Sequence, residues 1–362
     1  ASATLVMWFE LRSPELAEQL GAPAPDTPKG TAGVTGITHD SRAVRPGDLY
    51  AALPGTRLHG ADFVTQAAGL GAVAVLTDPT GAERAAATGL PVLVAPDPRA
   101  RMGELAATIY GHPGRDLLQI GITGTSGKTT TAYLVEGGLK TKSNTGLIGT
   151  VETRIGDERI KSERTTPEAT DLQALFAVMR ERGVEAVAME VSSHALVLGR
   201  VDGCVFDIGV FTNLSPEHME FHSDMEDYFR AKAQLFTPER SRLGIVNFDD
   251  EYGRRLVREA GVPIVTFSAE GHPDADWRAE DVRIGPMDST FLVRQRPLPF
   301  VGGQVAVVVA AGSVAEPPLV TSSSPPHVRA PPRIALVRVF PPTCSTVLPR
   351  PTWRSAPRCA PR

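Results

Sequence analysis

The sequence predicts an α/β protein with two α/β domains, the second built on a mainly parallel sheet. Short apolar runs alternate with amphipathic segments over much of the chain, as expected for βαβ units. A glycine-rich turn, GITGTSGKTTT at residues 121–131, joins an apolar run to a helical pattern. The 362 residues are enough for two or three domains with buried cores.

Residues 1–113 are predicted to form the small N-terminal α/β domain. Its apolar runs predict strands, and its segments of helical periodicity predict helices. The predicted strands cover residues 48–53, 71–77 and 90–94, and the predicted helices cover residues 63–70 and 99–110. The dipeptide His112-Pro113 is typical of a turn, so we expect the domain to end there.

Residues 114–292 are predicted to form a central domain with helices on both faces of its sheet. Strands are expected at 118–123, 184–191, 205–211, 244–247 and 263–267, and helices at 129–139, 169–182, 225–236 and 251–260. In such a sheet, ligands bind at the carboxyl ends of the strands. Three loops that follow these strands therefore should meet at one phosphate site.

The glycine-rich turn has the features of a P-loop and predicts ATP binding. Its glycines allow a sharp turn in which backbone N–H groups point at phosphate oxygens, while a lysine reaches the terminal phosphates and a hydroxyl contacts Mg2+. The predicted ATP-binding residues are Gly124, Thr125, Ser126, Gly127, Lys128, Thr129 and Thr130. The alternative is a strand-to-helix turn that binds nothing.

Glu190 ends an otherwise apolar strand, VEAVAMEV, where burial of a carboxylate without a partner is costly. Mg2+ would be such a partner, because it prefers oxygen ligands and binds to one or two protein groups. Glu190 and Thr129 are therefore the predicted metal ligands. The alternative is a strand-end glutamate paired with an arginine.

Residues 211–236 bring two histidines and several acids together just before a helix. His218 is predicted to lie near the metal or phosphate, and His222 is predicted to be structural. A zinc pair of the two histidines would need a third ligand, and no fixed spacing supplies one. Lys232 falls in the apolar stripe of the following helix, so its amine must reach solvent, lose its proton, meet an anion or be modified.

Composition excludes several classes of protein. No apolar run reaches the 18–20 or so residues needed to cross a bilayer, and the amino-terminal residues lack a signal-peptide pattern. Cys204, Cys344 and Cys359 have no metal or disulfide spacing, which favours the cytoplasm. We expect a monomer that neither inserts into a membrane nor binds nucleic acid.

Residues 293–362 differ in composition from the remainder. Positions 294–362 hold nine arginines, no lysine, one acid and 14 of the 31 prolines, which gives a charge of +8 against −12 for the other residues. The arginines lack interleaved aromatics, so nucleic-acid binding is not favoured. Frequent prolines predict a disordered tail. We interpret this tail as an out-of-frame reading of a GC-rich gene, which frame-corrected resequencing would test.

Four segments, in order and spacing, resemble the Mur ligases. They are GTSGKTTT, ERTTPE, MEVSSHALVLGRV and FTNLSPEHMEFHSDMEDYFRAKAQLF. The earlier segment HDSRAVRPGDLYAALPGTRLHGADF is similar to the UDP-binding domain of the members that add the third peptide residue. The resemblance covers about residues 10 to 292. It implies that a third, Rossmann-like ligase domain is missing and that the tail stands in its place.

The resemblance also implies an activity. ATP would phosphorylate the D-glutamate carboxylate of UDP-N-acetylmuramoyl-L-alanyl-D-glutamate, and a diamino acid would attack the acyl phosphate. Diaminopimelate and lysine both stay open as this amino acid, and diaminopimelate is favoured by its frequency in the family. Lys128, His218 and Lys232 would be catalytic. The metal ligands would be Thr129, Glu190, His218 and a carbamylated Lys232. The residues matched to sugar-peptide binding are Ser41, Thr56, Arg57, Leu58, Thr165, Thr166, Ser192 and Arg200.

Other interpretations remain open. Without a third domain the chain would be impaired, so a nucleotide-binding and UDP-sugar-binding module without catalysis is one alternative. A ligase similar to folylpolyglutamate synthetase is another, although DSRAVRPGD favours a UDP substrate. The sequence has no Asn-Lys-x-Asp run for reading guanine, which disfavours a GTPase.

Overall fold

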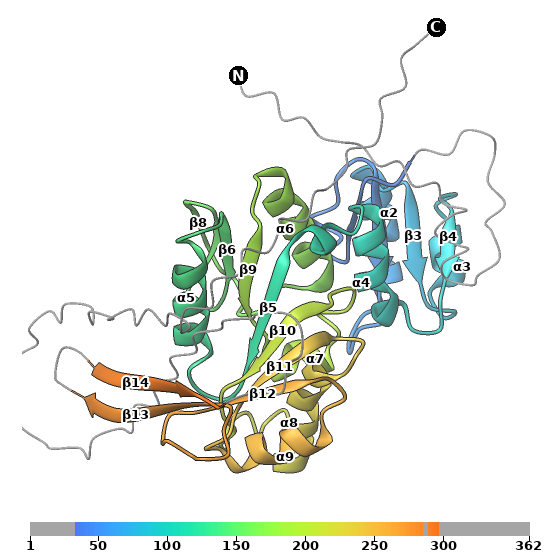
Figure 1. The fold of residues 1–362 in the computed structure, drawn as a ribbon. Coiled ribbons are helices and arrows are strands. Elements are labelled where there is room, and N and C mark those ends of the chain that lie inside the picture. The colour runs from blue at the N-terminus through green and yellow to red at the C-terminus, as the bar shows by residue number, and fades with distance from the viewer. Residues whose placement is uncertain (1–32, 285–288, 297–362) are drawn as a thin grey trace, which may run out of the picture.

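The computed structural model describes residues 33–284 and 289–296, which form two α/β units (Figure 1). The predicted tail lies almost entirely outside these residues. Its first three residues, 293–295, belong to a β-strand, so regular structure continues past the predicted boundary. Within the two described ranges, no helix is both long and apolar enough to cross a membrane.

The N-terminal unit is a four-stranded parallel sheet in the order β1-β2-β3-β4. The strands are β1 (Gly36–Thr38), β2 (Asp48–Ala52), β3 (Ala74–Thr77) and β4 (Val92–Val94). The helices are η1 (Gly60–Phe63), α2 (Val64–Gly69), α3 (Ala82–Ala86) and α4 (Pro98–Ile109). Successive side chains of β2 enter cores on opposite faces: Leu49 packs with α4, and Tyr50 packs with η1 and α2. Helices therefore cover both faces.

The central unit is a ten-stranded sheet in the order β14-β13-β12-β11-β10-β5-β9-β6-β7-β8. Its strands are β5 (Leu118–Thr123), β6 (Thr145–Ile148), β7 (Glu152–Ile155), β8 (Glu158–Lys161), β9 (Ala186–Glu190), β10 (Phe206–Phe211), β11 (Ser241–Asn247), β12 (Ile264–Ser268), β13 (Trp277–Ile284) and β14 (Ser289–Gln295). Parallel pairing joins the neighbouring strands β6, β9, β5, β10, β11, β12 and β13, given in their spatial order. Antiparallel pairing joins β7 to β6, β8 to β7 and β14 to β13. The predicted α/β fold with a mainly parallel sheet is confirmed.

Helices flank this sheet, both at the four predicted positions and at others. They are η2 (Pro113–Asp116), α5 (Lys128–Leu139), α6 (Ala169–Glu181), α7 (Ser193–Val197), α8 (Met225–Ala233), η3 (Gln234–Phe236) and α9 (Glu251–Glu259). Two separate cores, one on each face, include Phe176 and Phe229 on one side and Val135 and Ile245 on the other. The sequence pattern did not predict β1, α3, α7, β6–β8 or the β13–β14 hairpin.

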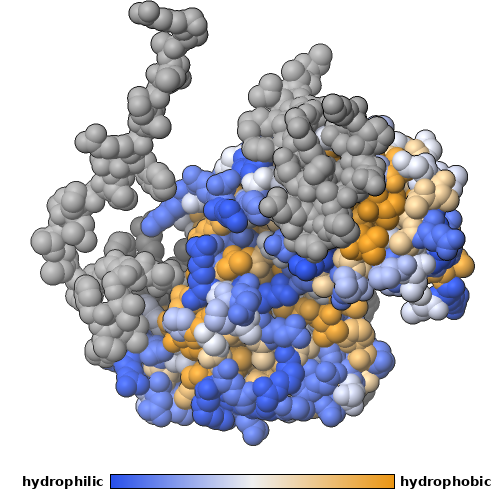
Figure 2. Space-filling view, turned by 90° about the vertical axis from the view of Figure 1, so that its right-hand side faces the viewer, coloured by the Kyte–Doolittle hydropathy of each residue, from blue (hydrophilic) through white to orange (hydrophobic). Residues whose placement is uncertain are grey.

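The two units contact each other along α4 and α6 (Figure 1). Gly103 lies so close to the turn after α7 that an added Cβ would be 2.1 Å from the carbonyl oxygen of Asp202. The Arg180 guanidinium donates to the carbonyl oxygens of Tyr110 and Gly111 at 3.1 Å each. Figure 2 shows one face of the molecule, with hydrophilic residues over much of its lower part and hydrophobic residues in separate patches.

Candidate active site

The candidate site lies at the carboxyl ends of β5, β9 and β10, which are neighbours in the order β10-β5-β9. β5 pairs with β10 on one side and with β9 on the other, and both strands follow β5 in the chain. In a parallel sheet, a crevice for ligands opens at the carboxyl end of a strand with this arrangement. A cavity of about 360 Å3 occurs there. Its lining residues are Thr125, Gly127, Lys128, Thr129, Thr130, Thr150, Thr165, Glu190, Ser192, Ser193, Glu217, His218 and Lys232.

The loop of residues 124–127 between β5 and α5 is held in shape by the end of β10. Gly124 (φ 145°) and Gly127 (φ 83°) both have positive φ, which other residues rarely adopt. An added Cβ on Gly124 would lie 1.9 Å from the hydroxyl of Thr212, which donates to the carbonyl oxygen of Ser126 at 2.7 Å. The backbone N–H of Ser126 donates to the Asn213 side chain at 2.9 Å.

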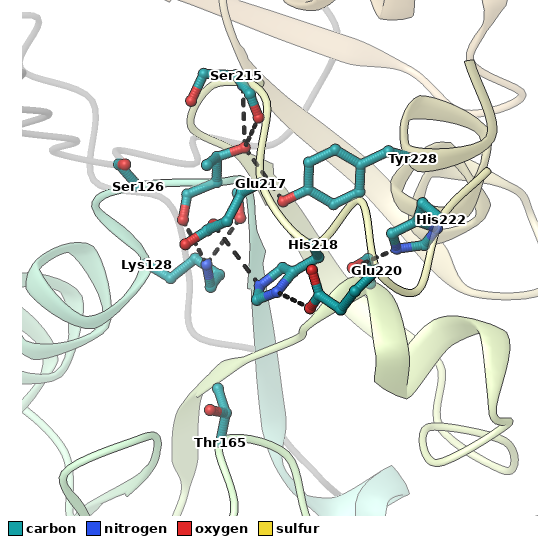
Figure 3. Close-up of polar contacts among 12 residues, drawn as sticks. Ser126, Lys128, Thr165, Ser215, Glu217, His218, Glu220, His222 and Tyr228 are labelled. Atoms are coloured by element: carbon teal, nitrogen blue, oxygen red, sulfur yellow. Dashed lines mark hydrogen bonds and ion pairs between the residues drawn. The ribbon is translucent and has the colours of Figure 1, made fainter. Parts of the chain in front are cut away.

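Lys128 begins α5, and its side chain turns back over the loop. Its Nζ donates to the carbonyl oxygens of Gly124 at 2.8 Å and Thr125 at 2.7 Å. Burial lowers the pKa of this amine, while the nearby carboxylates of Glu190 and Glu217 act in the opposite direction. Figure 3 shows Lys128, Glu217 and His218 close together, with Thr165 across from them.

Glu190 is almost fully buried and is surrounded by neutral donors. Its Oε1 accepts from the Thr129 hydroxyl at 2.9 Å and from the Thr150 backbone N–H at 2.8 Å. The Thr150 hydroxyl also donates to Oε2 at 3.2 Å. Within the described part of the chain Glu190 has no ion-pair partner, and its oxygens lie beside a hydroxyl in a cavity wall. A carboxylate and a hydroxyl so placed are a donor set that fits Mg2+.

Lys232 is buried in α8, with 1% of its surface exposed. Its Nζ donates to the Gly124 carbonyl oxygen at 2.9 Å and lies 4.4 Å from the centroid of the Tyr228 ring. Burial, reinforced by the positive charge of Lys128 and opposed by Glu217, lowers the pKa of Lys232 to about 7. A sizeable share of this amine is therefore neutral near neutral pH.

His218 lies in the loop before α8, with a φ of 60° that is unusual for a residue with a side chain. Its Nε2 is 3.7 Å from Oε2 of Glu217, and its Nδ1 is 3.4 Å from Oε1 of Glu220. His222 is buried, and its Nε2 lies 2.9 Å from the Ser193 hydroxyl. This burial agrees with the predicted structural role of His222.

The remaining predicted residues divide into two groups. Thr165 and Ser192 line the cavity; the buried Thr166 hydroxyl donates to the Glu190 carbonyl oxygen at 2.9 Å. Arg200 does not line the cavity; its Nε lies 3.0 Å from Glu168, which also pairs with Arg164 and Arg99. Ser41, Thr56, Arg57 and Leu58 lie in the N-terminal unit and do not line this cavity.

Comparison with known proteins identifies the family. The model for the Mur ligase middle domain matches residues 122–302, which is half of the chain, and that for the Mur ligase family catalytic domain matches residues 33–110. The chain belongs to the Mur ligase family. The two matched ranges fall in the central and N-terminal α/β units of this Mur ligase, respectively.

Individual relatives agree with this assignment. Over 279 residues the Mur ligase chain is 88% identical to the UDP-N-acetylmuramoyl-L-alanyl-D-glutamate–2,6-diaminopimelate ligase of Streptomyces avermitilis, covering 77% of this chain and 54% of the relative. It is 50% identical over 246 residues to the UDP-N-acetylmuramyl-tripeptide synthetase of Leifsonia xyli, covering 68% and 48%. The chain thus spans about half the length of the curated relatives it matches.

Solved structures show the same fold. A structure of UDP-N-acetylmuramoyl-L-alanyl-D-glutamate–2,6-diaminopimelate ligase aligns with a TM-score of 0.67 at 26% identity, covering 79% of this chain and 57% of that one. The MurF ligase of Thermotoga maritima, solved in complex with ADP, aligns with a TM-score of 0.51 at 20% identity, covering 72% and 56%.

Sequence reasoning assigned no role to three residues that line the cavity of this Mur ligase, namely Thr150, Ser193 and Glu217. Thr150 follows β6, a strand of only four residues that the pattern did not predict. Ser193 and Glu217 stand next to the predicted Ser192 and His218, so proximity along the chain was the available signal.

Proposed function

We propose that this chain is the nucleotide-binding and UDP-sugar-binding part of an ATP-dependent ligase of peptidoglycan biosynthesis. The enzyme would add a diamino acid to UDP-N-acetylmuramoyl-L-alanyl-D-glutamate. The observation that carries the proposal is that one cavity brings together Lys128 of the P-loop, the Thr129–Glu190 pair and the buried Lys232. The names of the relatives at 88% and 50% identity support the same reaction.

The proposed reaction has two steps. A D-glutamate carboxylate oxygen of the sugar peptide attacks the γ-phosphorus of ATP, and ADP leaves. The amine of the diamino acid then attacks the carbonyl carbon of the acyl phosphate; an amide forms, phosphate leaves and the amine loses a proton. The residues from Gly124 to Thr130 would bind the phosphates through backbone N–H groups and the ammonium of Lys128. The protein contributes mainly position and charge.

Thr129, Glu190 and His218 would hold Mg2+, which neutralises phosphate charge when it is bound. The first two offer oxygen atoms 2.9 Å apart in the cavity wall. His218 lines the same cavity from the opposite loop. Glu190 has no ion-pair partner among the described residues, so its carboxylate would be available to a cation.

Lys232 would react with CO2. The neutral amine forms an N–C bond to the carbon of CO2 and releases a proton, and the resulting carbamate carries a negative charge. The lowered pKa of about 7 supports this, because only the neutral amine reacts. The carbamate would add an anionic oxygen ligand beside Lys128 and His218, in a place where two amines now share the Gly124 carbonyl oxygen.

The sugar peptide would extend from the cavity toward the N-terminal unit. Thr165 and Ser192 line the cavity, and the Thr166 hydroxyl accepts a hydrogen bond from the Ser192 backbone N–H at 3.2 Å. The Arg200 side chain is mostly buried, beside Glu168. Arg200 would bind a substrate carboxylate by charge-assisted hydrogen bonds. Ser41, Thr56, Arg57 and Leu58 would contact the UDP end.

Diaminopimelate is the proposed third residue, because the relatives at 88% and 86% identity are named for it. We propose that its binding depends on the part of those relatives that this chain does not match. A nucleotide and UDP-sugar binding module without catalysis is the second candidate, and the half-length coverage favours it for the chain alone. Both would act in the cytoplasm, where the buried Cys204 thiol stays reduced.

The decisive experiment measures two quantities on the purified chain. ATP binding is measured by calorimetry, and phosphate release is measured with Mg2+, the sugar dipeptide and either diaminopimelate or lysine, followed by mass analysis of the product. Lys128→Ala is the variant, and Lys140→Ala, on the exposed end of α5, is its matched control. Binding with amide formation establishes the ligase and names the amino acid. Binding without phosphate release identifies the binding module, and no binding contradicts both.

A further inference from the structure

Three side chains beside the nucleotide cavity form a group of metal-ligand type. One ligand atom from each of His194, His218 and Glu220 lies within 4.8 Å of the other two. Two imidazoles and a carboxylate are a typical ligand set for Zn2+ and related transition metals. Mg2+ prefers oxygen ligands throughout, so this group differs in chemistry from the Thr129–Glu190 pair.

Two of the three ligands are held in place by their surroundings. The His194 ring in α7 stacks on Phe221, with centroids 4.0 Å apart and an interplanar angle of 29°. The His218 ring stands perpendicular to that of His194, with centroids 5.0 Å apart. The hydrogen bond between His222 and Ser193 fixes the residue next to His194. The imidazoles thus need little reorganisation to share an ion.

Glu220 supplies the adjustable ligand. Its side chain is 76% exposed, and its Oε1 already lies 3.4 Å from Nδ1 of His218 (Figure 3). In a zinc site with metal–ligand bonds of about 2 Å, the ligand atoms lie closer to one another than those of His194, His218 and Glu220 do here. A small movement of the exposed Glu220 carboxylate would bring the three ligand atoms within bonding distance of one ion. A fourth position would remain open to water.

We propose that, when no nucleotide is bound, His194, His218 and Glu220 bind a transition-metal ion of the Zn2+ type. A neutral imidazole binds one ion, so His218 would then hold this ion in place of the Mg2+ of the proposed function, whereas Thr129 and Glu190 lie outside the group. The ion would take Nδ1 of His218, whose Nε2 faces Glu217 in the cavity wall. Metal binding therefore fixes the orientation of a ring that also borders the nucleotide cavity. This binding does not depend on the proposed ligase function and is measured without substrate.

The test uses the full chain without nucleotide, in a buffer that does not chelate metals. Zn2+ binding is measured by calorimetry, and Co2+ serves as a spectroscopic probe whose visible bands report imidazole ligands and low coordination number. We expect one Zn2+ per chain, retained in a large excess of Mg2+. His194→Gln should weaken binding roughly tenfold or more, since even residues that only support a ligand matter on that scale.

The matched control is His272→Gln, which removes a part-exposed histidine that also stands beside an acid, 3.9 Å from Asp274. This variant should bind Zn2+ as the unaltered chain does. Glu220→Gln provides a second variant that leaves the packing intact, because the side chain is exposed, and it should also weaken binding. The proposal fails if the chain does not bind Zn2+, if His194→Gln and Glu220→Gln bind as well as the unaltered chain, or if His272→Gln loses as much.

Discussion

The two walls of the candidate cavity differ in how their buried charges are compensated. On one wall, the Glu190 carboxylate accepts three hydrogen bonds from Thr129 and Thr150. On the other, the Lys232 amine has one hydrogen bond, to Gly124, and shares that acceptor with Lys128. The acidic wall offers its carboxylate three hydrogen bonds, whereas the basic wall holds two amines near the Glu217 carboxylate, and neither amine forms an ion pair with it within the described residues.

This difference indicates what each wall still requires. Neutral donors stabilise a carboxylate without cancelling its charge, so the Glu190 wall remains suited to a cation. Two neighbouring amines repel each other and lose solvation on burial, so the Lys232 wall is suited to an anion or to chemical modification. A nucleotide phosphate with Mg2+ between the walls would satisfy both.

The largest expected effect comes from removing the buried amine in Lys232→Met. Lys232 has a folded-state pKa of about 7 against 10.5 for the free amine, so the unfolded state binds more protons between these values. Its burial therefore lowers stability most at and below pH 7, and the penalty disappears as pH rises to about 10.5. In CO2-free buffer at pH 7 the variant should be more stable by on the order of 3 kcal/mol.

The measurement is denaturant unfolding of both proteins from pH 6 to 10. The advantage of Lys232→Met should shrink steadily above pH 7. Lys140→Met, which alters an amine on the surface at the end of α5, should show no such trend. A pH-independent difference between Lys232→Met and the unaltered chain would show that the amine is not the cause.

The acidic wall should respond in the opposite way. Glu190→Ala leaves the Thr129 hydroxyl and the Thr150 N–H without their acceptor and should lower the free energy of unfolding by about 2 kcal/mol. Glu190→Gln keeps an acceptor oxygen and should cost less than about 1 kcal/mol. Both should lose Mg2+-dependent ATP binding, as measured by calorimetry. If Glu190→Gln binds ATP with Mg2+ normally, Glu190 is not the metal ligand.

The sequence predicted the parts of this site that adjoin regular strands. The runs at 118–123, 184–191 and 205–211 were apolar enough to identify as strands, and all three were confirmed. Parallel strands end at the same sheet edge, so the convergence of Lys128, Glu190 and the loop after β10 followed from topology. The roles of these residues stay predictions.

The features that sequence reasoning missed depend on contacts between distant segments. β7 and β8 are short and polar, and β8 is exposed along its length, so neither has a strand-like apolar pattern. His194, which joins His218 and Glu220 in the group of metal-ligand type, stands 24 positions before His218 in the sequence. Only the packing of α7 beside the loop before α8 brings the two rings together, and no local spacing encodes that contact.

A smaller effect is expected at Arg200, which does not line the cavity. Arg200→Ala should lower the affinity for the UDP-sugar dipeptide about tenfold, because a charge-assisted hydrogen bond contributes about 1.5–3 kcal/mol. ATP affinity should not change, since Arg200 does not line the nucleotide cavity. Calorimetry with the UDP-sugar dipeptide and with ATP, each titrated alone, measures the two affinities separately. The control is Arg242→Ala, at the amino end of β11. An equal loss of affinity for the UDP-sugar dipeptide in both variants would contradict the prediction.

The smallest effect concerns the support of the basic wall by Tyr228. The Tyr228 hydroxyl lies 3.2 Å from the Thr125 hydroxyl, which also forms hydrogen bonds with the backbone of Ser215. The Tyr228 ring lies against the Lys232 amine. Tyr228→Phe removes one buried hydrogen bond and keeps the ring, so it should lower the free energy of unfolding by about 1 kcal/mol.

Because the ring stays, the midpoint of the Lys232-dependent pH trend should stay near pH 7. Tyr228→Leu removes the ring as well and should shift that midpoint downward, since the cation–π contact favours the charged amine. An equal midpoint in the two variants would show that the Tyr228 ring does not influence the buried amine.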